Sequence, residues 1–570
     1  MHIRRFSERD ADNSYWKGIS KTEVLRVGGS SKETPTILIS AMRGAIKRPM
    51  KSYPWSIAKV WRGDVVPMKI MKKEIETERE IGYRYLQVLS RAEALTPGAG
   101  REAIDVLLWD ANAVVARTDV QSDRVVLDGT LSCQAVYRQG DESTLRAVNA
   151  KAGISQAAEI PGAQGGMMCR VQSVVENVEA KYENGHMVFL VSLGFHVWVM
   201  KLENLEVIDG IEETAALETR YAELCLVKLA AEANETAVLT ARVEVPQAID
   251  ARATLMDWGT VALDSSEPDL GGVRVKGRAT VETLIASGVA GKPAVAVKYP
   301  IEFDKLIELP EWLSRDAHVT PTLRAVRTQL ERSDENSEGE LMIQADVHFD
   351  IAANLRECVR ALEDAYATDG TGLTLQMQTL EACTGVERAA TVETVRGAAL
   401  IPEGTPAASG VVAVRAIPNI AEINAEAGGS RISGIIETTV LYLSGENGVP
   451  ASVGAGLPFE ARVPQQLGER SEVRMSIISA EANALMGDRF EIKIMLSLDC
   501  ETRVQQRFEL VSDIEAGACE PKRPGYVIAW PEPDDDAWSI GKRYGIAAER
   551  VESGASDGAI TAGSPVILRI

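Results

Sequence analysis

The chain has 570 residues, of which 45% are hydrophobic and 25% charged, and its formal net charge is −21. At roughly 100–200 residues per domain, this length excludes a single small module and predicts several domains. The acidic balance argues against nucleic acid as a partner, because a polyanion would be repelled. No stretch reaches the roughly 18 apolar residues of a membrane helix, and no apolar core of a cleaved secretion signal is found near the start, which predicts no integral membrane segment and no secretion.

Residues 1–67 differ from the rest of the chain in charge. They hold thirteen Lys and Arg against six Asp and Glu, a charge of +7, which leaves −28 for the remainder. Two interpretations stay open: a disordered basic tail that docks on an acidic partner or membrane surface, or upstream sequence translated from a start codon assigned too early. The second is favoured, because Met68 and Met71 stand directly before Lys72, where the sequence begins to look like the rest of the protein.

The cysteines form no recognisable framework. Their number is odd and no CxxC pair occurs, which predicts neither a disulfide framework nor a zinc knuckle and favours a reducing compartment. The seven are Cys133, Cys169, Cys225, Cys358, Cys383, Cys500 and Cys519.

An internal repeat is the most informative pattern. Gly129, Gly277 and Gly434 each lie in a strand-like run, 148 and then 157 residues apart, and a large apolar residue stands eight positions after each. An apolar-proline pair follows every glycine after 30 to 33 residues, at Pro161, Pro310 and Pro464. We expect the glycine to mark a β-bulge or a close backbone approach, and the proline to mark the entry to an edge strand or loop.

After each proline, two alternating runs separated by a polar turn such as Asn184-Gly185 predict a β-hairpin. The repeat therefore predicts a mainly β fold of three serial β domains. Apolar residues at helical spacing predict short helical linkers at 212–236, around Leu217, Tyr221, Leu224 and Leu229, and at 352–366. The expected organisation is 1–67 extension, 72–210 domain 1, 237–352 domain 2, 385–515 domain 3 and 524–570 terminal module.

The terminal module resembles a LysM domain. The resemblance rests on Gly525-Tyr526-Val527-Ile528, on the run from Ala537 to Ile546, and on the closing run from Ile560 to Leu568. It implies a small βααβ fold, with a first helix beginning near Trp538. The turn before that helix is Pro531 to Asp536, where family members carry Gly-Asp-Thr in a loop that holds N-acetylglucosamine polymers.

The repeated units resemble the SPOCS domain of spore-forming bacteria, through the strand that carries each glycine, through Ile160-Pro161-Gly162 and through Ile417-Pro418-Asn419-Ile420. Three such domains followed by one LysM domain are similar to the architecture of SipL-like spore coat morphogenesis proteins. The resemblance implies a non-enzymatic scaffold in the mother-cell cytoplasm, at the forespore surface. There its LysM domain would bind a SpoIVA-like coat ATPase and tether the coat, with other coat proteins or further copies of itself as additional partners. The alternative is a peptidoglycan-binding protein whose β repeats act as spacers.

No catalytic residue, metal site or cofactor site is predicted. The five histidines are scattered, no phosphate-binding loop occurs, and the GxSxG match at Gly554–Gly558 lies in a loop-like run. Within strand-like runs, His196 and His348 are interpreted as hydrogen-bonded strand residues. The acidic run Asp534–Asp536 is interpreted as a helix cap, with calcium binding as the alternative.

Partner binding is assigned to the terminal module. Trp530, which precedes the acidic turn, is the best candidate for an exposed aromatic anchor. For the other aromatic residues of the module, packing in its core is the alternative. The predicted partner-binding residues are Trp530, Asp534, Asp535, Trp538, Lys542 and Tyr544.

Overall fold

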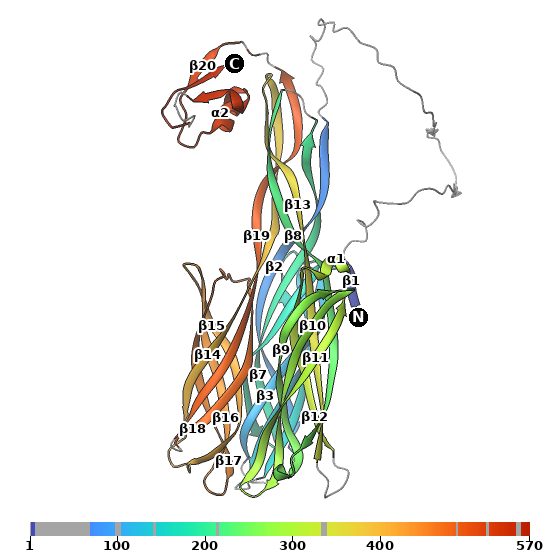
Figure 1. Cartoon of the computed structure of the whole chain (residues 1–570), viewed down its shortest axis with the longest axis vertical. Coiled ribbons are helices and arrows are strands. Elements are labelled where there is room, and N and C mark those ends of the chain that lie inside the picture. Colours follow the sequence, from blue (N-terminus) through green and yellow to red (C-terminus); the bar gives the residue numbers. More distant parts are fainter. Residues whose placement is uncertain are drawn as a thin grey trace, which may run out of the picture.

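The structure is a computed structural model that describes residues 2–5, 69–96, 104–140, 144–212, 216–331, 339–485, 488–519, 522, 524–553 and 560–569. Most of these residues lie in antiparallel strands, which confirms the predicted mainly β fold. One six-strand arrangement occurs three times along the chain and is followed by a small terminal module (Figure 1). None of the helices in the described part is long and apolar enough to cross a membrane.

Each of the three units is built from six strands that follow one another in the sequence. Unit 1 has β2 (Ile70–Leu95), β3 (Ile104–Gln121), β4 (Arg124–Gln139), β5 (Leu145–Glu159), β6 (Met168–Glu183) and β7 (His186–Ile211). Unit 2 has β8 (Leu217–Val245), η1 (Gln247–Ile249), β9 (Ala251–Asp269), β10 (Gly272–Val289), β11 (Lys292–Glu308), α1 (Glu311–Ser314), β12 (Ala317–Glu331) and β13 (Gly339–Ala367). Unit 3 has β14 (Thr371–Leu400), β15 (Ala408–Glu426), β16 (Gly429–Ser444), β17 (Val449–Val463), β18 (Glu472–Leu485) and β19 (Arg489–Cys519).

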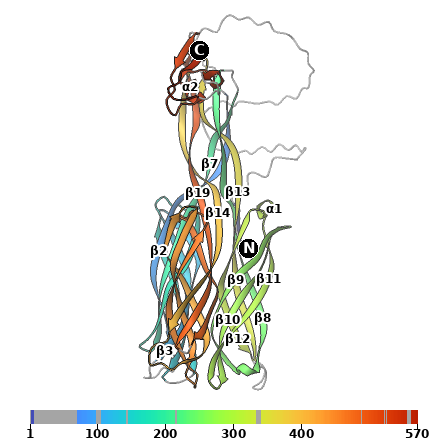
Figure 2. The same ribbon diagram turned by 60° about the vertical axis from the view of Figure 1, so that its left-hand side comes forward.

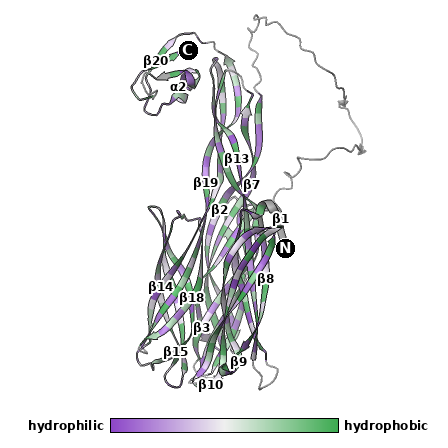
Figure 3. Ribbon diagram, in the orientation of Figure 1, coloured by the Kyte–Doolittle hydropathy of each residue, from purple (hydrophilic) through white to green (hydrophobic). Residues whose placement is uncertain are grey.

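Each unit is a sandwich of two three-stranded sheets. In unit 1 the sheets are β3-β4-β5 and β2-β7-β6, so the first strand of the unit pairs with the last. Units 2 and 3 repeat this order, and β1 (His2–Arg5) adds a further strand to β8 in unit 2. The rest of the predicted 1–67 extension lies outside the described residues. Hydrophobic residues alternate with polar ones along the strands (Figure 3). Their buried side chains form a separate core in each sandwich.

The first and last strands of each unit continue beyond the sandwich and build a common stalk. The stalk consists of residues 70–80 and 201–211, 217–230 and 354–367, and 371–384 and 502–519, which form three two-stranded ribbons. The ribbons pack around one another through Ile75, Val207, Leu224, Val359, Leu380 and Leu510. The sandwiches therefore stand side by side at one end of the stalk (Figures 1 and 2).

The predicted helical linkers are wrong. Residues 217–245 form β8, and residues 352–366 lie inside β13. Leu217 and Tyr221 are four residues apart, a spacing that places two side chains on one face of a strand as well as of a helix. Leu224 and Leu226 are both buried in the stalk. Their spacing of two residues is the period at which side chains of a strand point to the same face.

The predicted role of the repeated glycines is confirmed. Gly129, Gly277 and Gly434 lie on the middle strands of their sheets, and each faces a β-bulge in the neighbouring strand. A Cβ atom on these residues would lie 2.4, 2.3 and 2.0 Å from a carbonyl oxygen of that bulged strand. The approach is too close for any side chain, which explains why glycine recurs there.

We predict that Gly434→Ala lowers the free energy of unfolding by about 1–3 kcal/mol, because its methyl group would overlap the Asn419 carbonyl oxygen. Chemical denaturation followed by intrinsic fluorescence measures this loss. Gly410→Ala is the matched control in the same unit, since a Cβ there meets nothing within 4 Å. If Gly410→Ala lowered the free energy of unfolding as much as Gly434→Ala, the result would contradict a close approach between residue 434 and the Asn419 carbonyl oxygen.

The repeated prolines also lie where the sequence predicts them. Pro161, Pro310 and Pro464 come directly after the buried residues Ile160, Leu309 and Val463, in the loops that lead into the edge strands β6, β12 and β18.

At the end away from the stalk, the three sandwiches share an apolar contact. Its members include residues at the same position of each middle strand, namely Val136, Leu284 and Leu441.

The expectation that the cysteines are unpaired is wrong for two of them. Cys225 on β8 and Cys358 on β13 are joined by a disulfide, while Cys133, Cys383 and Cys500 are free. The two bonded residues are direct neighbours in the β8–β13 ladder although 133 residues separate them in sequence. The spacing of the cysteines in the sequence does not predict this pairing, because only the register of β8 against β13 brings the two residues together.

Candidate partner-binding site on the terminal module

The terminal module is a three-stranded sheet covered by one helix. Its elements are β20 (Tyr526–Ala529), α2 (Ala537–Tyr544), η2 (Ala548–Arg550), β21 (Val551–Ser553) and β22 (Val566–Arg569), and β22 lies in the middle of the sheet. The second helix of the predicted βααβ order is only the single 3₁₀ turn η2, followed by the additional strand β21. Val551 pairs with Leu568 there and packs on the module core, which a longer helix would prevent.

Helix α2 begins where the acidic run ends, as predicted. The Asp536 carboxylate accepts a hydrogen bond from the backbone N–H of Ser539 at 2.7 Å, and the Ser539 hydroxyl accepts one from the N–H of Asp536 at 3.0 Å. This reciprocal cap satisfies two backbone donors that the first helical turn leaves without partners. At the other end, Gly545 adopts a left-handed conformation with φ 59° and ends the helix.

One side of α2 is fixed to the tip of the stalk. The Asp364 carboxylate of β13 accepts hydrogen bonds from the Trp538 indole N–H at 2.8 Å and from the Lys542 ammonium at 2.6 Å. Although burial opposes ionisation, these two donors lower the pKa of Asp364. Tyr366 contacts the Trp538 ring edge to face, and the Arg220 guanidinium lies over it at 5.3 Å. Trp538 and Lys542, both predicted to bind a partner, therefore contact the stalk in this structure.

The outer face of the terminal sheet carries large exposed apolar side chains. Tyr526, Ile528 and Trp530 alternate along β20 and its extension and are 74%, 56% and 62% exposed. Ile567 on β22 pairs with Ile528 and is 49% exposed, whereas its neighbour Leu568 is fully buried on the inner face. We call these four residues the apolar face. Such a contiguous group marks a surface that binds another molecule more often than isolated exposed residues do.

The other predicted site residues lie around the module rather than on this face. Asp534 is exposed in the loop before α2, whereas Asp535 forms a two-pronged ion pair with Arg543 at 2.7 and 3.0 Å. Tyr544 packs on the module core. Only Trp530 belongs to the apolar face. Tyr526, Ile528 and Ile567 were missed, although their alternation with the buried residues of a short strand could have indicated them.

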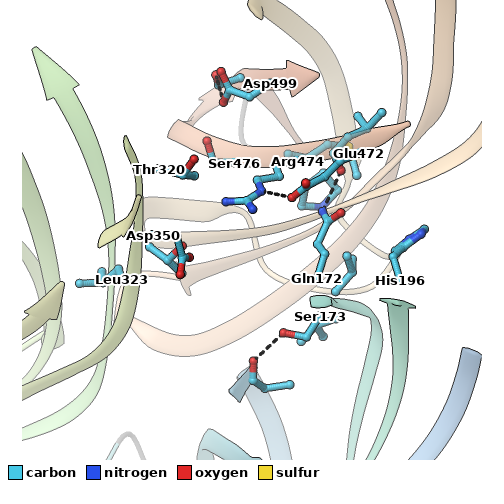
Figure 4. Close-up of a pocket in the computed structure, with 18 of the residues that line it drawn as sticks. Gln172, Ser173, His196, Thr320, Leu323, Asp350, Glu472, Arg474, Ser476 and Asp499 are labelled. Carbon is cyan, nitrogen blue, oxygen red and sulfur yellow. Dashed lines mark hydrogen bonds and ion pairs between the residues drawn. The ribbon is translucent and has the colours of Figure 1, made fainter. Parts of the chain in front are cut away.

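A second candidate is the cavity between the three sandwiches. It has a volume of about 2230 Å³ and is lined mainly by the edge strands β3, β6, β9, β12, β15 and β18. Figure 4 shows Ser173 of unit 1, Thr320 and Asp350 of unit 2, and Arg474 and Asp499 of unit 3 around it. Side-chain amides fix the units across it: Gln172 donates to the carbonyl oxygen of Val473 at 2.8 Å (Figure 4). The cavity thus lies where edge strands of all three units meet.

Arginine side chains in this cavity form ion pairs within and between units. Arg170 of unit 1 donates to Glu501 at 2.8 Å and to Glu472 at 2.9 Å, and Arg388 also donates to Glu501. Burial disfavours the ionised Glu501 carboxylate, but Arg170 and Arg388 outweigh this cost and lower its pKa from 4.5 to about 2. The network joins unit 1 to unit 3.

Two histidines beside this cavity are hydrogen-bonded strand residues, as predicted. In unit 2, His348 contacts the Thr236 hydroxyl at 2.9 Å and the Asp350 carboxylate at 3.1 Å. In unit 1, His196 contacts the Tyr83 hydroxyl at 2.8 Å, and burial lowers its pKa. Both imidazoles therefore use a ring nitrogen to hold neighbouring strands.

We predict that Glu501→Gln changes the dependence of stability on pH. Because the pKa of Glu501 is lower in the folded chain than in the unfolded chain, its contribution is present above pH 4.5 and is lost as the pH falls toward about 2. The full contribution is about 3 kcal/mol, of which about 2 kcal/mol is lost by pH 3. Urea unfolding at pH 6 and pH 3 should show that this loss is absent in Glu501→Gln and retained in the control Glu509→Gln, an exposed residue of the same strand. If Glu501→Gln lost as much free energy of unfolding between pH 6 and pH 3 as the wild type does, the result would contradict the ion-pair network.

One segment of the chain is similar to a known protein family. Residues 102–183 match the family model described as "SipL, SPOCS domain", and this segment contains β3 to β6 of unit 1. No curated protein matches the chain, and no solved structure does. Over residues 102–183 the chain is similar to the SPOCS domain of SipL, which supports a SipL-like family and suggests a sporulation-related protein.

Proposed function

We propose that this protein is a non-enzymatic scaffold of bacterial spore coat assembly, and that its terminal module binds a SpoIVA-like coat ATPase and so tethers the coat to the forespore. The observation that carries the proposal is the apolar face, formed by Tyr526, Ile528, Trp530 and Ile567. The similarity of residues 102–183 to the SPOCS domain of SipL supports the sporulation setting.

The placement of the apolar face suits an adaptor. Asp364 holds helix α2 on the stalk through Trp538, and the Tyr366 hydroxyl donates to the carbonyl oxygen of Ile546 just after the helix. The outer face of the sheet stays exposed. A partner bound to this face would therefore lie beside the stalk tip (Figure 1). Burial of two aromatic and two aliphatic side chains provides the kind of anchor that dominates protein interfaces.

The sandwiches at the other end of the stalk suit a scaffold. Each contains sheet edges, where backbone groups can pair with an added strand. Ion pairs and shared apolar contacts between the units make this end a single body. Under this proposal the terminal module binds the ATPase while the sandwich end contacts other coat proteins or further copies of the chain.

Binding of the full chain to two immobilised targets, a recombinant SpoIVA-like ATPase and insoluble peptidoglycan, tests the proposal. We expect saturable binding to the ATPase and none to peptidoglycan. Binding to peptidoglycan alone would refute the adaptor function and favour the carbohydrate-binding alternative, because exposed tyrosine and tryptophan rings also stack on sugars. Binding to neither target would refute both.

A further inference from the structure

The disulfide lies on the outer side of the stalk. Cys225 and Cys358 are opposite each other in the β8–β13 ladder, with a Cα–Cα distance of 4.0 Å. Their neighbours Leu224 and Val359 are buried in the stalk core, so the cysteine side chains point the other way. Cys358 is exposed and Cys225 half-buried, and reagents in solution can therefore reach the pair.

A carboxylate completes a group of three possible metal ligands. Glu223 lies two residues before Cys225 on the same face of β8, and its carboxylate oxygen and both sulfur atoms lie within 4.8 Å of one another. This is the one such group of three among the residues that the structure describes. Thiolate sulfur together with carboxylate oxygen is a ligand set that zinc accepts, whereas calcium and magnesium prefer oxygen alone.

The arginine opposite Glu223 in the β8–β13 ladder does not pair with its carboxylate. Arg360 is the cross-strand neighbour of Glu223, yet its guanidinium lies over the Tyr221 ring at 4.4 Å and donates to the carbonyl oxygen of Asp209 at 3.1 Å. Across the described part of the chain, neither an ion pair nor a hydrogen bond of the Glu223 carboxylate is found. The carboxylate is therefore available to a ligand beside the sulfur atoms.

We propose that the reduced form of this pair binds one Zn²⁺ through the thiolates of Cys225 and Cys358 and the carboxylate of Glu223, with water in the fourth position. A dithiol reductant first transfers two electrons and two protons to the disulfide, which becomes two thiols while the reductant becomes a cyclic disulfide. Zn²⁺ then displaces both thiol protons. The disulfide has no thiolate to offer, so the oxidised chain does not hold zinc here.

The site links β8 to β13 in either state. In an oxidising compartment the link is the disulfide, and in a reducing compartment, which the family resemblance implies, it is the metal. The zinc site belongs to the stalk and is independent of what the terminal module binds.

The test uses the full chain, reduced in one sample and oxidised in the other, after dialysis against Zn²⁺ and removal of free metal. We expect about one Zn²⁺ per reduced chain and none per oxidised chain. With Co²⁺ as a spectroscopic probe, the reduced chain should show a thiolate-to-cobalt charge-transfer band in the near ultraviolet. Reduced chain without bound metal would overturn the proposal.

Variants locate the metal. Cys225→Ser with Cys358→Ser should abolish zinc binding and the cobalt band, and unchanged binding would place the metal on other thiols and overturn the assignment. Glu223→Gln should weaken zinc binding by at least about tenfold, since even residues that only support a metal ligand cost 10–100-fold when changed. Glu244→Gln, an exposed glutamate of the same strand, is the matched control and should bind as the wild type does. Equal affinity of the Glu223 and Glu244 variants would remove the carboxylate from the site.

Discussion

Trp530→Ala is expected to weaken binding of the full chain to the SpoIVA-like ATPase, its proposed partner, by about 30-fold or more. Trp530 is 62% exposed and lies on the apolar face with Tyr526, Ile528 and Ile567. Central aromatic anchors of an interface typically cost at least about 2 kcal/mol when truncated, which corresponds to this loss in affinity. Titration of labelled chain with the SpoIVA-like ATPase measures the dissociation constant directly.

A matched control separates this effect from a general loss of surface hydrophobicity. Leu270 is 84% exposed and lies in the turn between β9 and β10 of unit 2, far from the terminal module in sequence. Leu270→Ala should leave the affinity unchanged. Comparable losses in the two variants, or no loss in Trp530→Ala, would show that the apolar face is not the docking site.

Arg503→Met is expected to lower the free energy of unfolding by about 3–5 kcal/mol, the cost of leaving a buried charge without its partner. The partner is Glu78, which is fully buried at the base of the stalk. One carboxylate oxygen accepts from Arg503 at 2.8 Å, and the other accepts from the backbone N–H of Leu229, also at 2.8 Å. Arg503 additionally donates to Asn354 at 3.1 Å, so residues of all three units meet at this point.

Equilibrium unfolding in guanidinium chloride provides the measurement. Arg507→Met, on the same strand, removes an exposed ion pair with Glu509 and should cost less than about 1 kcal/mol. The double variant Glu78→Leu with Arg503→Met should recover much of the loss, because neither charge then remains buried alone. A small loss in Arg503→Met would mean that the contact does not hold the three units together.

Local patterns in the sequence predicted the features that depend on backbone geometry. Gly129, Gly277 and Gly434 were predicted to lie at bulges or close approaches because glycine alone tolerates such contacts. The turn at Asn184-Gly185 has positive φ angles of 51° and 89°, which both residues adopt readily. These features are encoded within a few residues, and reading them requires no knowledge of the rest of the fold.

Features that depend on the register of distant strands could not be predicted in this way. The stalk ribbon of β8 and β13 was interpreted as helical linkers, because a long strand with bulges loses its strict alternation. The same ribbon brings Cys225 to Cys358, and the stalk tip brings Asp364 to Trp538. Trp538 was therefore assigned to partner binding, since the sequence does not reveal that the stalk already covers it.

Hydrogen exchange of the full chain, measured with and without the SpoIVA-like ATPase, tests the central claim most directly. We expect the partner to slow exchange of backbone amides at 526–530 and 566–569 and to leave the strands of the three units unchanged. Slower exchange confined to residues 69–519, with no change in the terminal module, would contradict docking on the apolar face.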